Sequence, residues 1–501
     1  MFARWLRFGD QMPARTQSSR AGIRGMGAAI VAVLVAGACG GAAVTPASSA
    51  VSSSTPWPSV PAGPTSTPAS TPTPVATPTV DGPTPFLTQE PGSDFAVALG
   101  KAGLFAPAAD SGALAGTQIN DFGFDLLRRL DPSGNLCASP ASIALALAMV
   151  RPGARGATAT EMDKVLHGFG TPAQAGEIVS LLKALGAVTT FDESDPQATP
   201  DPSAKPVVEL DVSNAVFAQK GMSLQAAYLD ALTSGFGAGL GLLDYRNDPE
   251  GARQIINKWA SDRTKGRIPA VLQPGDIDSM TRIALANAIY LRAAWATQFD
   301  PAATRSLPFT RMDGSTVSVP TMAIGRVFGY AAGAGYRAVT LPFTGSALSM
   351  TIVVPDDMAS FVNSLTSDRL AAIGNQAKPY LVNLALPRFS AETRTDLAAQ
   401  LAAMGMPALF DSSAADLSGI TTDEHLSIAK VIHQANIDVV EQGTTAAAVT
   451  VAVGRATAIG PAEGIQTVTF NVDRPFIYLI REQTTGTVLF LGRVADPSSK
   501  S

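Results

Sequence analysis

The stretch of sequence that decides the fold is residues 440–476, VEQGTTAAAVTVAVGRATAIGPAEGIQTVTFNVDRPF. From Thr444 to Gly454 it has no charged residue and no proline, and β-branched residues alternate with small ones. Proline is kept out of central strands because it cannot donate to the hydrogen-bond ladder, so this run is suited to the interior of a sheet. The run nevertheless ends in Gly454-Arg455 and Gly460-Pro461, which are typical of an exposed loop.

The run therefore has the composition of a buried strand but the position of an exposed loop, and such a conflict is expected at a functional site. A segment fit for a central strand but placed on a loop is otherwise exposed to aggregation. The simpler alternative is an ordinary buried strand that is followed by a loop. Successive side chains of a strand point to opposite faces. One face of an extended run would hold Thr444, Ala446, Ala448, Thr450 and Ala452, and the other Thr445, Ala447, Val449, Val451 and Val453.

Two parts of this stretch resemble the serpin family. Glu441-Gln442-Gly443-Thr444, followed by Thr445 and three alanines, resembles the mobile hinge of a serpin, and residues 470–476 resemble the family's C-terminal signature. Other segments match in order and at family spacing over about residues 115–497. They are residues 135–143 (NLCASPASI), 153–162 (GARGATATEM), 212–217, 255–259 with 264–268, and 489–494.

The resemblance implies an α+β serpin fold, with three β-sheets, about nine helices and an exposed reactive-centre loop. It also implies an inhibitor of serine proteases that is itself no enzyme. In this mechanism the protease cleaves the loop, is held as an acyl-enzyme, and is distorted when the loop inserts into the main sheet. Small, uncharged hinge residues favour insertion. The hinge residues that the resemblance assigns are Glu441, Gly443, Thr444, Ala446, Ala447, Ala448 and Thr450.

The cleaved bond is placed by the family's usual spacing from Glu441. That spacing gives Thr457–Ala458, which suits an elastase-like or subtilisin-like protease with a modest primary pocket. Arg455–Ala456 is the alternative, and would suit a trypsin-like enzyme. A cysteine protease also stays open as the target.

A buried polar cluster is the other implied site. Asn287 lies among apolar residues of a predicted strand, and a buried amide needs partners to offset its desolvation. By resemblance it belongs with Ser139, Ser142 and His433 under the centre of the main sheet, where the strands part to admit the loop. Trp295 is expected where the loop begins to insert.

The N-terminus resembles the signal peptide of a bacterial lipoprotein. Five arginines precede a short apolar run, and small residues lead directly to Cys39. Lipidation of Cys39 and a plain secretory signal are the alternatives, and translation could begin at Met12 or Met26. Residues 41–80 carry no charge and are dense in Pro, Thr and Ser, which predicts a spacer. The expected parts are residues 1–38 as signal peptide, 39–95 as disordered linker and 96–501 as the serpin domain.

The composition narrows the remaining functions. The chain has 501 residues, 46% of them hydrophobic, and a net charge of −5. The first 38 residues carry five Arg and one Asp, a net charge of +4, so the rest carries −9, which argues against a nucleic-acid partner. The chain has only three histidines and two cysteines, and it lacks hydrolase and P-loop motifs. We therefore expect no metal, no cofactor and no enzymatic activity.

The expected protein is an extracytoplasmic monomer, anchored to a bacterial membrane or secreted. A non-inhibitory serpin-fold binding protein and a solute-binding lipoprotein remain alternatives.

Periodicity gives expected bounds for several elements. Residues 120–130 form a predicted helix capped by Asn120, and a buried helix follows Ser139-Pro140. Residues 426–441 form a predicted long strand that runs into the hinge. Residues 476–494 form a predicted hairpin about the turn at 483–486, and Trp259 is expected to be a core aromatic on a helix.

Overall fold

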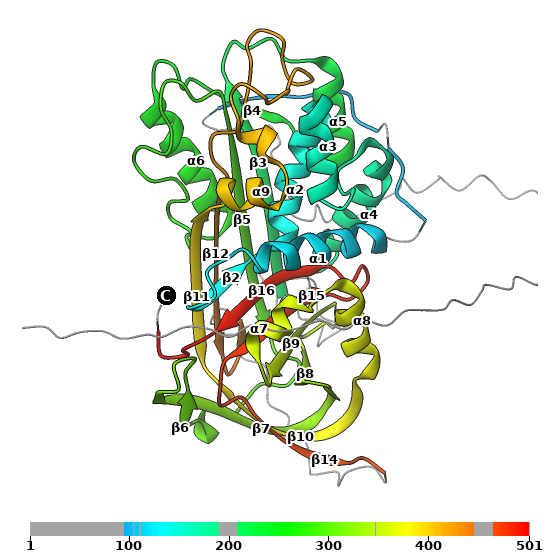
Figure 1. Ribbon diagram of the computed structural model, residues 1–501, viewed down its shortest axis with the longest axis vertical. Helices are drawn as coiled ribbons and strands as arrows, with labels where there is room; N and C mark the ends of the chain where they lie inside the picture. The colour runs from blue at the N-terminus through cyan, green and yellow to red at the C-terminus, as the bar shows by residue number, and fades with distance from the viewer. Residues whose placement is uncertain are drawn as a thin grey trace, which may run out of the picture. The chain divides into compact units, whose positions relative to one another are not determined.

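The computed structural model describes residues 95–103, 105–109, 112–189, 208–345, 347–444 and 464–499. All of them belong to one compact unit, Thr77–Ser501. Nine α-helices and two β-sheets lie in these ranges, which confirms the expected α+β class (Figure 1).

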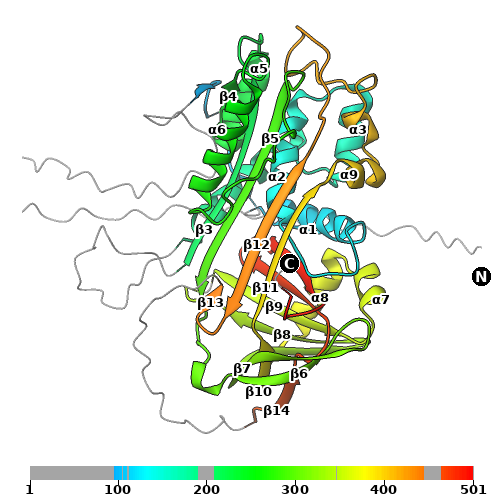
Figure 2. The ribbon, with the colours of Figure 1, turned by 90° about the vertical axis from the view of Figure 1, so that its left-hand side faces the viewer.

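The main sheet has seven strands and holds the hinge. Its central strands β5 and β12 run side by side, with the short β13 between them at one end (Figure 2). The order across the sheet is β1 (Ala96–Ala98), β4 (Leu240–Leu243), β3 (Val208–Gln219), β5 (Ile283–Ala294), β13 (Gly443–Thr444), β12 (Ile432–Val440) and β11 (Phe389–Asp396).

Helices cover both faces of this sheet (Figure 1). On one face lies α2 (Pro140–Val150), in which every residue is buried. It begins where the sequence predicts, because the Ser139 side chain accepts from Ser142 N and Pro140 is preset for the first helical turn. On the other face lies α6 (Pro249–Arg263), whose Trp259 packs edge-on against Phe217 of β3 with 5.9 Å between ring centroids. Trp259 is therefore a core aromatic, as predicted.

The second sheet has nine strands, where the family resemblance predicts two separate smaller sheets. The strand β7 (Thr316–Gly333) is 18 residues long. It pairs with β6 (Arg305–Thr310) and β10 (Lys378–Pro387) over its first part and with β8 (Tyr336–Pro342) near its end, so it joins the two smaller sheets into one. The order is β14 (Thr467–Asn471), β10 (Lys378–Pro387), β7, β8 (Tyr336–Pro342), β9 (Leu348–Pro355), β15 (Phe476–Glu482), β16 (Val488–Val494) and β2 (Leu136–Ala138), with β6 (Arg305–Thr310) on β7.

The helix α1 (Ala113–Leu127) begins seven residues before the predicted start, so the assignment of Asn120 as its cap is wrong. Asn120 is instead a buried anchor in the middle of the helix, because its amide donates to Gly486 O at 3.0 Å and accepts from Val488 N at 2.7 Å. The other helices are α3 (Gly156–Val165), α4 (Ala175–Gly186), α5 (Ala226–Phe236), α7 (Met358–Asn363), α8 (Ser367–Gln376) and α9 (Ala398–Met404).

The strand that leads to the hinge is shorter than predicted. It starts at Ile432 and not at residue 426, because the amides of Ile428 and Val431 donate to Leu409 O and to the Asp396 carboxylate, outside the ladder. The predicted hairpin at residues 476–494 is confirmed as β15 and β16.

Candidate functional site

The strand β13 is the first part of the hinge and already lies inside the main sheet. Thr444 pairs with Val439 of β12 on one side and with Ala293 of β5 on the other, antiparallel to both. Its side chain is fully buried, and its Oγ1 accepts from Ala293 N at 3.2 Å. Within the described residues no ladder joins β5 directly to β12, so β13 marks a seam between two halves of the sheet.

Gly443 is required by the close approach of β5. A Cβ at this position would lie 2.0 Å from Ala293 O, and the backbone φ of +148° is one that side chains rarely adopt. Any other residue would therefore push the hinge out of the seam.

The turn that precedes β13 is tied to the end of β5. Phe299 N donates to Glu441 O, and Trp295 N donates to Gln442 O, each at 3.0 Å. The Trp295 indole donates to Val440 O at 2.9 Å and stacks on Phe343 with 4.5 Å between ring centroids. Trp295 thus lies beside the hinge turn, at the end of the seam that is here called its entrance.

Glu441 is buried at this entrance as an ion. Burial alone would raise the pKa of its carboxyl, but hydrogen bonds from Arg388 and Thr304, together with the Arg388 charge, outweigh burial and hold that pKa below its ordinary value. The Arg388 Nε lies 2.7 Å from the carboxylate. Because Arg388 follows β10 and directly precedes β11, this pair fastens the entrance to the edge of the sheet.

The predicted polar cluster is assembled across the same seam. Ser139 N donates to His433 Nε2 at 3.1 Å, so the ring proton sits on Nδ1, which donates to Asn287 Oδ1 at 2.9 Å. Ser142 N donates to the Ser139 hydroxyl at 3.2 Å. The His433–Asn287 bond joins β12 to β5, so it must break if a strand enters between them.

The comparison with family models decides the identity of the fold. The model described as "Serpin (serine protease inhibitor)" matches residues 117–497. The chain belongs to the serpin family.

Similar proteins agree with this assignment. The serpin is 35% identical over 395 residues to "Leukocyte elastase inhibitor" of Equus caballus, covering 76% of this chain and 99% of that protein. It is 33% identical over 390 residues to the protein of the same name in Homo sapiens, covering 75% and 97%. Among solved structures, the native thermophilic serpin tengpin gives a TM-score of 0.68 at 24% identity, covering 79% of this chain and 97% of that one.

One member of the polar cluster was missed by the sequence reasoning. Asn214 of β3 lies opposite Asn287, accepts from its amide at 2.7 Å and accepts from the Ser142 hydroxyl at 3.4 Å. Its own Nδ2 is buried without a partner among the described residues. An asparagine flanked by apolar strand residues is the signal that identified Asn287, and it applies equally to Asn214.

The cluster does not include Trp295. Trp295 follows β5 eight residues beyond Asn287, which corresponds to about 26 Å along an extended chain. It belongs to the entrance of the seam, and only Ser139, Ser142, Asn287 and His433 of the predicted set meet below the sheet.

Several predicted residues lie outside the described ranges. They are Cys39, the hinge residues Ala446, Ala447, Ala448 and Thr450, and the residues of the two candidate bonds, Arg455, Ala456, Thr457 and Ala458.

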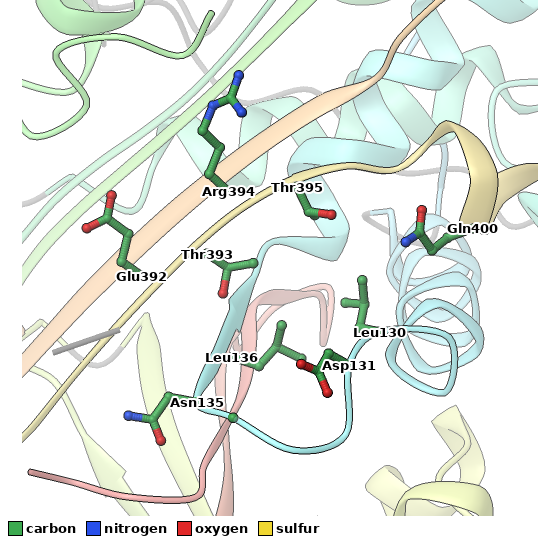
Figure 3. A pocket seen from close by; sticks show the side chains of 10 residues that line it. Leu130, Asp131, Asn135, Leu136, Glu392, Thr393, Arg394, Thr395 and Gln400 are labelled. Atoms are coloured by element: carbon green, nitrogen blue, oxygen red, sulfur yellow. The ribbon is translucent and has the colours of Figure 1, made fainter. Parts of the chain in front are cut away.

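Pockets in the described part of the chain include a groove at the edge of the main sheet. This groove of about 330 Å³ lies beside β11, with Thr393 and Gln400 on its wall (Figure 3). The Thr393 hydroxyl already accepts from Cys137 N at 3.0 Å, so this group holds β11 in place. The described residues contain no group of three metal-ligating side chains, and none of their helices is both long and apolar enough to span a bilayer.

Proposed function

We propose that this serpin inhibits serine proteases by offering its reactive-centre loop as a substrate and trapping the acyl-enzyme as the loop enters the main sheet. The relatives named leukocyte elastase inhibitor, which it matches over nearly their whole length, support an elastase-like target. In the trapping step, the protease serine oxygen bonds to the loop carbonyl carbon, and the peptide nitrogen beyond it leaves as an amine.

The placement of β13 is the observation that carries the proposal. Gly443 and Thr444 sit as a two-residue strand between β5 and β12, bonded to both. Beyond β13, the His433–Asn287 bond crosses the seam between β12 and β5. A longer strand could therefore grow from β13 by replacing that bond with ladder hydrogen bonds.

The register of β13 fixes where each later hinge residue would go. Continuing it places Ala446 between Ile437 and Leu291, Ala448 between Ala435 and Ile289, and Thr450 between His433 and Asn287. Small side chains at the first two positions avoid overpacking against the isoleucines and leucine. At the third, the Thr450 hydroxyl arrives where the His433–Asn287 bond is lost and can partner both groups.

The energy of such an insertion is large enough to deform a bound protease. About ten new ladder hydrogen bonds at ~1 kcal/mol each contribute on the order of 10 kcal/mol. Burial of the alanine, threonine and valine side chains adds to this.

We place the cleaved bond at Thr457–Ala458, with Arg455–Ala456 as the alternative for a trypsin-like target. We also propose that the protein is a monomer exported from a bacterial cell and held at its membrane through a lipid on Cys39. The sequence before residue 95 is the support for the anchor and the location.

A protease panel tests the inhibitor proposal. The full chain is mixed with elastase-like, subtilisin-like and trypsin-like proteases and run on denaturing gels. We expect an SDS-resistant adduct of the summed mass with at least one protease, and the mass of the released C-terminal fragment identifies the bond. Cleavage in the loop by every protease without any adduct would contradict inhibition and favour a non-inhibitory binding protein.

A further inference from the structure

The segment between α6 and β5, residues 264–282, is here called the bridging segment. It contacts strands on both sides of the seam. Its contacts with β3 and β5 are predominantly apolar, and its contacts with β11 and β12 are predominantly polar and charged.

On the side of β3 and β5 the contacts are mostly apolar, with one ion pair between Lys265 Nζ and Glu209 Oε1 of β3 at 3.5 Å. Ile268, Val271, Leu272 and Ile277 are buried in one cluster with α6 and with the alanines of β5, and the cluster reaches across the seam to Ile432 of β12. The segment is also fixed to α6, because the Asn257 amide donates to Leu272 O and accepts from Leu272 N, each at 2.8 Å. The bridging segment and α6 therefore form one body on this half of the sheet.

On the side of β11 and β12 most contacts are polar, and three of them are ion pairs. Asn436 Nδ2 of β12 also donates to Arg267 O at 3.1 Å, and Arg394 Nε donates to Val271 O at 3.2 Å. The Asp276 carboxylate lies 2.5 Å from Arg394 Nη2 of β11 and 2.8 Å from Lys430 Nζ, just before β12. Nearer the hinge, Arg267 Nη1 lies 3.1 Å from Asp438 Oδ2 of β12. Figure 3 shows the Arg394 and Thr393 side chains on opposite sides of β11.

These ion pairs cannot survive the entry of a strand unchanged. A new strand separates its neighbours by about 4.8 Å, whereas the pairs measure 2.5–3.1 Å. The bridging segment and α6 should stay attached to β3 and β5 when the sheet opens, because most of their buried apolar contacts are with these strands. The charged contacts to β11 and β12 must then open.

The Asp276 pairs are the stronger of these contacts. The Asp276 side chain is 13% exposed, whereas Arg267 and Asp438 are each 40% exposed. Exposed pairs are screened by water and salt and contribute little. Burial alone would raise the pKa of Asp276, but the hydrogen bond and charge of Lys430, a hydrogen bond from Gln273 N and the Arg394 charge hold it below its ordinary value.

We propose that Asp276, held by Arg394 and Lys430, is a clasp across the seam that sets the rate at which the main sheet opens for the loop. This rests on the proposed function, because the clasp acts only if a strand enters the seam. Asp276 is a positioning residue that touches neither the protease nor the loop.

The test measures strand entry without a protease. The full chain is incubated with a fluorescein-labelled peptide of residues 444–454, and uptake is followed by fluorescence anisotropy. Asp276→Asn keeps an acceptor for Gln273 N but removes the charge. We expect it to take up the peptide about five-fold faster, the factor that corresponds to ~1 kcal/mol of lost ion pairing. Lys430→Gln leaves the Asp276–Arg394 pair in place and should therefore give a smaller increase in the rate of peptide uptake. It provides the test if Asp276→Asn does not fold.

Two controls separate the clasp from a general loss of stability. Asp276→Glu keeps the charge and should restore the wild-type rate. Asp262→Asn removes an ion pair with Lys258 that lies within α6 and does not cross the seam, so it should leave the rate unchanged. Raising NaCl from about 0.05 M to about 0.5 M should speed uptake by the wild-type chain more than by Asp276→Asn, because salt screens the pair.

The two proposals fail in different ways. If the wild-type chain takes up the peptide but Asp276→Asn and Lys430→Gln do so at the same rate, the clasp is wrong and loop insertion stands. If the wild-type chain takes up no peptide at any salt concentration, loop insertion is wrong, and the clasp is overturned with it.

Discussion

Thr444→Arg is expected to convert the inhibitor into an ordinary substrate. Thr444 is fully buried between Val439 and Ala293, so an arginine there would bring an unpaired guanidinium into the seam. Burying such a charge costs ~3 kcal/mol or more. In the intact chain the hinge can leave the seam and avoid this cost, but insertion brings residue 444 back between β5 and β12. The cost then falls on the barrier to insertion and slows it by at least about 100-fold. The protease then completes hydrolysis and leaves before it is trapped.

Adduct yield on denaturing gels measures this effect, with loop cleavage quantified in the same lanes. The matched control is Thr445→Arg. If the strand continues in the register of β13, alternation would put residue 445 on the opposite face from Thr444, beside Asp438, whose side chain is 40% exposed and can pair with a cation. Thr445→Arg should keep most of the adduct. An unchanged adduct yield in Thr444→Arg would exclude insertion from this hinge.

A loss of stability at mildly acid pH is the second large effect, and it comes from His433. Burial lowers the pKa of its imidazole to about 4, against about 6.5 in the unfolded chain. As pH falls below 6.5, the unfolded chain binds a proton that the folded chain does not, so the free energy of unfolding decreases. The decrease reaches ~3 kcal/mol near pH 4. A protonated ring would also turn Nε2 into a donor facing the donor Ser139 N.

Urea unfolding, followed by tryptophan fluorescence at pH 7 and pH 5, measures this contribution. We expect the His433 contribution to fall by ~2 kcal/mol between these values. His433→Gln, which has no titrating ring, should lose that part of the pH dependence. His425→Gln, at an exposed position, should retain it. Equal pH dependence in the wild type and His433→Gln would mean that His433 is not held neutral by burial.

The sequence was sufficient for features that depend on local chemistry. Ser139-Pro140 marks the start of α2, because a side-chain cap and a preset φ act within one helical turn. The hinge was predicted by its resemblance to the serpin family, because the uncharged, proline-free run alone is equally compatible with an ordinary buried strand. The family resemblance then supplied the partners of His433.

Features that depend on distant partners were harder to predict. Asn120 looked like a helix cap, but its partners Gly486 and Val488 are more than 360 residues away in the chain. The fusion of two sheets through β7 depends on its pairing with three other strands. The Asp276 clasp joins a loop to two segments over 100 residues away, and no local pattern marks such a contact.

The most direct test of loop insertion compares the intact chain with the chain cleaved once between residues 445 and 463. Cleavage frees the hinge to continue β13 through the seam, adding on the order of 10 kcal/mol of ladder hydrogen bonds. For a domain of this size the thermal midpoint should rise by roughly 10 °C or more. Scanning calorimetry on both forms, with the nick located by mass spectrometry, gives the answer. A cleaved chain that melts at or below the temperature of the intact chain would contradict the account.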